Sequence, residues 1–187
     1  KTKVWLAFMA ILRNNRPLLI ELFRSVYIPG FLMYAAYGMT AAITPLYATS
    51  LGGALALAGV VVSMRGLGQL VMNVPSGLIM GRFGNRKLLL ISTFCAIAIA
   101  LFTGLSNSIS LLAICMFLAG SVQSTWSITR VSHVRSIVPP EFRGRAISAI
   151  GGAVRIGGFV GPIVGGYIAK FFGFSTVFFV QAGIIGI

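Results

Sequence analysis

Apolar residues run along this chain in long blocks that polar positions interrupt only briefly. No side chain is charged between residues 25 and 64, or between residues 88 and 129. A membrane-spanning helix needs about 20 mainly apolar residues, so each block has room for about two such helices. No block shows the strict apolar and polar alternation of barrel strands. The pattern therefore predicts transmembrane helices.

Turn residues divide the apolar sequence into six predicted helices. These spans cover residues 18–48, 55–80, 88–105, 109–131, 146–169 and 175–187. The predicted fold class is all-α, a polytopic transmembrane bundle forming one six-helix half-domain over residues 18–187. The sixth span is too short to cross about 30 Å of hydrocarbon, so we expect it to be truncated and the parent protein to continue past Ile187. Residues 1–17 are predicted to be a cytoplasmic segment with a short amphipathic stretch.

Composition agrees with a membrane protein, because 57% of the residues are hydrophobic and only 9% are charged. The mean hydropathy is +0.96. Soluble domains carry about 25% charged residues, so a soluble enzyme is excluded. The 15 basic residues outnumber the 2 acidic ones, but they are dispersed between long uncharged blocks. This spacing argues against nucleic acid as a partner and for the lipid bilayer.

Orientation follows from the basic residues, since basic loops tend to stay cytoplasmic. Twelve of them precede the first span or lie between the second and third or the fourth and fifth: Lys1, Lys3, Arg13, Arg16, Arg24, Arg82, Arg86, Lys87, Arg130, Arg135, Arg143 and Arg145. The opposite loops carry only Lys170. We therefore expect a multi-pass protein with a cytoplasmic N-terminus, and we expect Arg130 and His133 at the cytoplasmic surface.

Two arginines, Arg65 and Arg155, lie inside predicted spans. Ten residues at a rise of 1.5 Å place each of them about 15 Å deep, near the membrane midplane. Charges there are costly and usually face protein or a water-filled cavity. Gln69, Asn73 and Ser76 follow Arg65 at helical spacing and predict a polar, cavity-lining stripe. The alternative is that both arginines bond to carbonyls and polar groups between packed helices.

Other chemistry is sparse in this sequence. There is no Asp, and Glu21 and Glu141 both lie near predicted cytoplasmic ends. No Cys and His spacing suits a metal, no glycine-rich loop suits a phosphate, and no nucleophile has a neighbouring base. Cys95 and Cys115 lie in apolar runs, where buried small side chains are the simplest interpretation. We expect no enzyme activity, no cofactor and no metal site.

The stretch between the second and third spans carries a motif. Its glycines and basic residues are Gly77, Arg82, Gly84, Arg86 and Lys87. Their spacing resembles the G-x-x-x-D-R-x-G-x-R-[RK] loop of the major facilitator superfamily, transporters built from two six-helix halves. The resemblance implies a cytoplasmic gating loop. Gly81 stands where the family has an acidic residue that helps latch the two halves together.

The fifth span carries a second motif, Gly157, Gly161, Pro162, Gly165 and Gly166. Glycines every four residues make a flat helix face, and Pro162 favours a bend. The pattern G-x-x-x-G-P-x-x-G-G resembles the fifth helix of the antiporter, multidrug-efflux-like branch of the same superfamily. Ser148 and Met116 replace a glycine and an arginine that this family often has.

The resemblance implies a secondary active transporter that moves a small organic solute by alternating access, with efflux antiport favoured by the fifth span. Its solute would bind near Arg65, Gln69, Asn73 and Arg155. A second six-helix half, in the same or another chain, would be the partner. The alternative is a transporter-like membrane subunit that does not transport and belongs to a larger assembly.

Overall fold

The computed structural model describes residues 27–186, apart from the side chains of residues 141 and 142. This described part is helical and contains no strand, which confirms the predicted all-α class. Its helices are α3 (Ile28–Ser50), α4 (Leu55–Phe83), α5 (Asn85–Gly104), α6 (Ile109–Ile137), α7 (Pro140–Phe172) and α8 (Phe174–Ile185). The expected segment 1–17 and the expected start of the first span at residue 18 lie outside the described residues.

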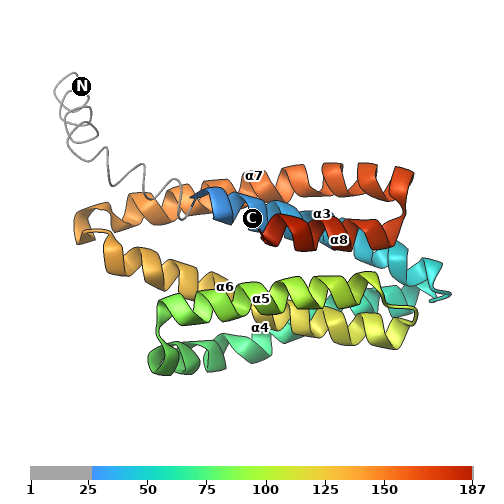
Figure 1. Cartoon of the computed structure of the whole chain (residues 1–187), viewed down its shortest axis with the longest axis horizontal. Helices are drawn as coiled ribbons and strands as arrows, with labels where there is room; N and C mark the ends of the chain where they lie inside the picture. The colour runs from blue at the N-terminus through green and yellow to red at the C-terminus, as the bar shows by residue number, and fades with distance from the viewer. Residues whose placement is uncertain (1–26, 187) are drawn as a thin grey trace, which may run out of the picture.

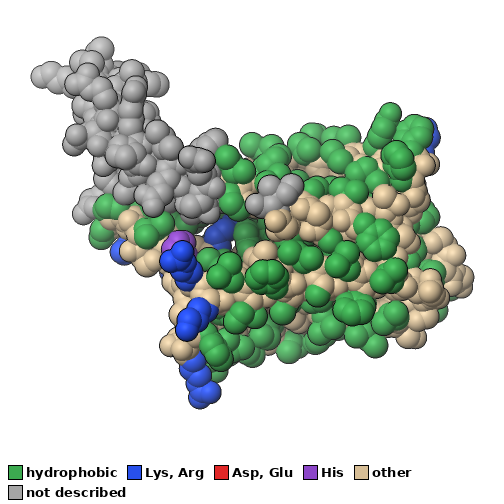
Figure 2. Space-filling view, in the orientation of Figure 1, with side chains coloured by type: hydrophobic (Ala, Val, Ile, Leu, Met, Phe, Trp, Pro, Cys, Tyr) green, Lys and Arg blue, Asp and Glu red, His purple; other side chains and the backbone are tan. Residues whose placement is uncertain are grey.

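Several helices are built to face lipid. α4, α5, α6 and residues Arg143–Phe172 of α7 are each long and apolar enough to cross a membrane, and α8 is a shorter apolar helix. In hydrocarbon a helix satisfies its backbone hydrogen bonds internally, which explains why these apolar runs become helices. Large apolar side chains such as Leu55 and Phe159 are exposed and cover much of the visible surface (Figure 2).

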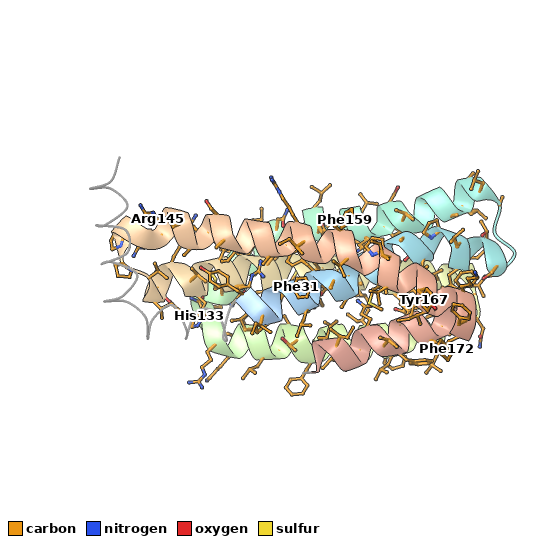
Figure 3. The ribbon with its side chains drawn as sticks, turned by 90° about the horizontal axis from the view of Figure 1, so that it is seen from above. Phe31, His133, Arg145, Phe159, Tyr167 and Phe172 are labelled. Atoms are coloured by element: carbon orange, nitrogen blue, oxygen red, sulfur yellow. The ribbon has the colours of Figure 1, made fainter. Side chains whose placement is uncertain are left out.

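The helices run up and down between two ends. The α4–α5 and α6–α7 connections lie at one end, and the α3–α4, α5–α6 and α7–α8 connections lie at the other (Figure 1). Arg145 and His133 mark the first end, while Tyr167 and Phe172 mark the second (Figure 3). The two basic connections predicted from the sequence therefore share one end of the bundle.

Some connections are very tight, and glycine makes them possible. Gly84 is the only residue between α4 and α5, with φ of 76°, and Gly173 is the only residue between α7 and α8, with φ of 87°. Residues with a Cβ rarely adopt positive φ. Most of the motif around Gly77 and Arg82 is therefore helical, because α4 continues to Phe83 and the chain reverses at Gly84 alone.

Packing pairs α3 with α7 and α4 with α6, while α5 contacts α6 and α8. A mid-bundle cluster joins α3, α5, α6 and α8 through Met33, Ala36, Tyr37, Ala96, Trp126 and Ile185. At the basic end, Val134 and Val138 pack against Ala146 and Ile150 of α7. This contact explains why α6 continues to Ile137 rather than ending with the apolar sequence near Val131.

Candidate functional site

The α4 and α6 backbones approach closely through a pair of glycines. A Cβ at Gly68 would overlap the carbonyl oxygen of Phe117, and a Cβ at Gly120 would overlap that of Arg65. Each glycine thus leaves room for the backbone of the other helix to approach closely, as small residues do at membrane helix interfaces. The approach brings the polar side chains on either side of this contact within hydrogen-bonding reach.

Polar side chains of α4 and α6 are hydrogen-bonded along this contact. Arg65 donates from Nε to Oε1 of Gln123 at 3.0 Å, and Gln69 donates from Nε2 to the same oxygen at 3.1 Å. Closer to the basic end, Ser124 donates to Asn73 at 2.5 Å. The hydroxyls of Ser76 and Thr125 lie 2.8 Å apart. We call this set the α4–α6 polar seam: Arg65, Gln69, Asn73, Ser76, Gln123, Ser124 and Thr125.

The seam contains the whole polar stripe predicted from Arg65 to Ser76. Its side chains bond to α6, which matches the alternative that such residues join packed helices. Ser76 is fully buried, but Arg65 and Gln69 are only half-buried and Asn73 is exposed. The seam therefore has a buried side between α4 and α6 and a side that is exposed on the bundle, and a solute cavity along the exposed side stays a prediction.

Arg65 also contacts α3. Its guanidinium carbon lies 4.8 Å from the centre of the Tyr37 ring. A cation over an aromatic face is stabilised by the ring's quadrupole, by about 0.5–2 kcal/mol depending on solvation. No acidic residue occurs in α3, α4, α5, α6 or α8, so within these helices aromatic rings and amides stabilise the charge.

Arg130 is a site residue that the sequence analysis missed. It was expected at the cytoplasmic surface, and its level in the membrane stays a prediction, but its side chain is buried between the helices at 5% exposure. Its guanidinium carbon lies 4.6 Å from the Trp126 ring centre and 5.3 Å from that of Tyr34. Its Nε and Nη1 have no hydrogen-bond partner among the described residues. Trp126, one helical turn before it, was the available sequence signal.

The aromatic rings connect the two arginines. Tyr34 packs edge-on against both Tyr37 and Trp126, with ring centres 6.4 Å and 6.3 Å apart. The Tyr34 hydroxyl also lies 3.3 Å from that of Ser127 on α6. The rings thus run along the α3–α6 contact from the cation of Arg65 to the cation of Arg130.

Arg155 has a different environment from Arg65 despite its similar position along its helix. It is exposed on α7, whereas Arg65 is turned toward α3 and α6. Position along a helix fixes depth, but rotation about the helix axis decides which way a side chain faces. A cavity shared by both arginines therefore remains a prediction.

The glycines of α7 divide between two faces. A Cβ at Gly157 would lie 2.7 Å from the Phe31 carbonyl oxygen, and one at Gly165 would lie 2.7 Å from the Met39 Cα. Gly161 lies between them on the same α3-facing side. Gly166, by contrast, is exposed with nothing within 4 Å of an added Cβ. Pro162 lies beside Gly38 of α3.

The basic motif residues lie exposed at the end that carries the α4–α5 connection. Arg82, Arg86 and Lys87 are all exposed, as are Gly77 and Gly84. Near them, Asn85 donates to the Ser132 hydroxyl at 3.2 Å and fastens the start of α5 to α6. Among the described residues, no group of His, Cys, Asp or Glu could hold a metal ion.

Comparison with known families decides the identity. Residues 26–187 match the sequence pattern of the Major Facilitator Superfamily. The chain belongs to the major facilitator superfamily. As a member of this transporter family with several apolar helices, it is an integral multi-pass membrane protein.

Curated superfamily members similar to this chain include efflux proteins. The chain is 26% identical to the multidrug export protein EmrB of Haemophilus influenzae over 75% of this chain and 28% of that protein. It is 25% identical to the multidrug resistance protein MdtG of Proteus mirabilis over 92% of this chain and 43% of that protein. The uncharacterized transporter YfkF of Bacillus subtilis is 24% identical over 72% of this chain and 34% of its own length. The chain thus spans less than half the length of these relatives.

Proposed function

We propose that this chain is the first half of a secondary active transporter that moves a small organic solute by alternating access, and that it works as an efflux antiporter. The observation that carries the proposal is the α4–α6 polar seam. It holds a cation and two amides on half-buried positions within helices otherwise suited to lipid. Polar groups at such depth are expensive unless they serve structure or transport.

The second part of this proposal is a partner half that covers α4 and α7. In the most apolar 18-residue stretch of each of these helices only 17% of the residues are buried, against 39% for α6. On α7, glycines of the outer face such as Gly158 and Gly166 have open space beside them. Close helix packing uses such small residues. A second six-helix half, in the same or another chain, would supply the missing wall of the solute site.

Efflux is favoured by two observations. The chain resembles EmrB and MdtG, whose names describe multidrug export and resistance. In addition, the glycine face of α7 packs directly on the α3 backbone through Gly157, Gly161 and Gly165, as the antiporter-like motif implies. We propose that this flat contact lets α3 and α7 move as one unit while the two halves rock.

Arg65 sets the proposed solute chemistry. Its charge has no acidic partner within its own helix or the neighbouring α3, α5, α6 and α8, so a carboxylate, phosphate or sulfonate on the solute would be attracted to it. Arg155 contributes to the same site if the second half brings the exposed face of α7 into the cavity. Both arginines thus favour anionic solutes.

The test compares Arg65→Gln with the matched variant Arg155→Gln in proteoliposomes. Paired anionic and neutral solutes, such as benzoate and benzamide, report selectivity, and folded yield is checked for each variant. We expect Arg65→Gln to lose preference for the anion of each pair, with a smaller loss in Arg155→Gln. Unchanged selectivity in two folded variants would make the arginines structural and remove the anion proposal.

A second function, a membrane subunit that does not transport, is favoured by Gly81. This residue stands where the family motif has an acid, and nothing lies within 4 Å of an added Cβ. Restoring the acid as Gly81→Asp tests this alternative. If the unchanged protein does not transport and Gly81→Asp gains a large solute flux, the subunit function is supported. Solute flux in the unchanged protein would exclude the subunit function.

A further inference from the structure

A small cavity between the helices is bordered by Arg65. Neither Gln69 nor Gln123 lines it. Its walls come from five helices: Tyr37, Thr40, Arg65, Ala96, Ile99, Ala100, Thr103, Met116, Ala119 and Gln181. It has about 10 Å³ of room for the centre of a water-sized sphere, which is about the minimum needed to hold one water molecule.

Two buried polar side chains line this cavity, and one of them lacks a hydrogen-bond partner among the described residues. Tyr37 is 4% exposed, and its hydroxyl is buried without a hydrogen bond. Gln181 on α8 is 5% exposed and also lines the cavity. A buried polar group left unsatisfied costs about 1–3 kcal/mol. The unsatisfied Tyr37 hydroxyl in the wall of this cavity, with the Gln181 amide also in the wall, indicates that a polar guest belongs there.

The charge of the wall favours an anion over water as this guest. Arg65 is the only charged residue of the lining, and α3, α4, α5, α6 and α8 contain no acid to balance it. Tyr37 and Gln181 can each turn a donor toward a guest. Thr40 and Thr103 already donate to carbonyls of their own helices, at 3.2 Å to Tyr37 and 2.6 Å to Ile99.

We propose that this cavity binds a monatomic anion of the chloride class, held by the Arg65 cation, the Tyr37 hydroxyl and the Gln181 amide. Because the cavity has room for about one water molecule, it favours a monatomic ion over sulfate or a carboxylate-bearing organic solute. Met116 in the wall is flexible and can yield to an ion slightly larger than water. The ion site shares Arg65 with the polar seam, but Tyr37 and Gln181 lie outside the seam, so a substitution at Tyr37 tests the ion site without removing a seam residue.

Chloride binding is measured by broadening of the ³⁵Cl resonance on addition of the purified protein in a neutral detergent. Ionic strength is held constant with sodium gluconate. We expect broadening that bromide reverses and sulfate does not, because bromide fits a one-atom site. Since the net charge of +13 also attracts anions without a site, equal displacement by sulfate and bromide would overturn the proposal.

A charge-neutral substitution locates the site. Tyr37→Phe removes only the unpartnered hydroxyl, and Tyr167→Phe is the matched control because Tyr167 is exposed on α7. A hydrogen bond to an ion contributes enough that its loss should weaken chloride binding about tenfold or more. Equal broadening by two folded variants would show that the cavity holds water only. Should Tyr37→Phe fail to fold, the comparison of bromide with sulfate on the unchanged protein decides whether the protein has a one-atom anion site.

Discussion

Replacing Gly161 by alanine tests the close contact between α3 and α7. The added Cβ would overlap the Ala35 carbonyl oxygen and lie 2.8 Å from the Gly38 Cα and the Met39 nitrogen. Ordinary contact begins at 3.4 Å, so the two backbones must separate by at least about 0.6 Å, and by more at the Ala35 oxygen, which lies nearest. Because every atom met is backbone, no side chain can yield. Overpacking costs about 1–3 kcal/mol, and alanine recovers up to about 1 kcal/mol of helix propensity. Because three backbone atoms are met at once, the cost lies in the upper part of that range, about 2–3 kcal/mol, and we expect a net loss of about 1–2 kcal/mol.

The loss should lower the melting temperature by about 2–8 °C for a chain of this size. Cys115 reports unfolding through a thiol-reactive fluorophore, since it is 4% exposed in the folded protein, while the exposed Cys95 is first replaced by serine. Gly158→Ala is the matched control, because an added Cβ there meets nothing within 4 Å. We expect its melting temperature to stay unchanged or rise. Equal shifts in the two variants would refute the packing argument.

Three further predictions concern orientation, the seam and the buried arginine. In a cysteine-free background, a cysteine at Asn107 should react with an impermeant maleimide from outside and one at Asn85 only after permeabilisation; the reverse pattern would invert the topology. Gln123→Leu leaves two donors of α4 without their acceptor and should cost about 1–3 kcal/mol of stability, whereas Gln123→Glu should retain it in the same thermal assay. Arg130→Met removes two unpartnered buried nitrogens and should leave the melting temperature unchanged or higher, so a clear decrease would show that the cation stabilises the fold.

The helical class and the family could be predicted from sequence because both depend on local patterns. Long uncharged blocks predict helices, since a backbone in lipid must bond within its own segment. The glycine and arginine motif between Gly77 and Lys87 indicated the superfamily that the match over residues 26–187 confirms. Helix ends were harder to predict from the sequence. For example, α6 extends to Ile137 because α7 packs against its last turns.

The direction of each side chain was decided only by tertiary structure. In water, an apolar face identifies the inside of a helix, but lipid is as apolar as the core, so hydrophobic pattern does not fix rotation about the helix axis. Sequence could therefore place Arg65 and Arg155 at similar depth, while packing turned Arg65 toward Tyr37 and Gln123 and left Arg155 exposed. Arg130 became buried for the same reason. The sequence by itself determined the helices and the family, and the glycine contacts that set how the helices face one another decided which polar groups meet.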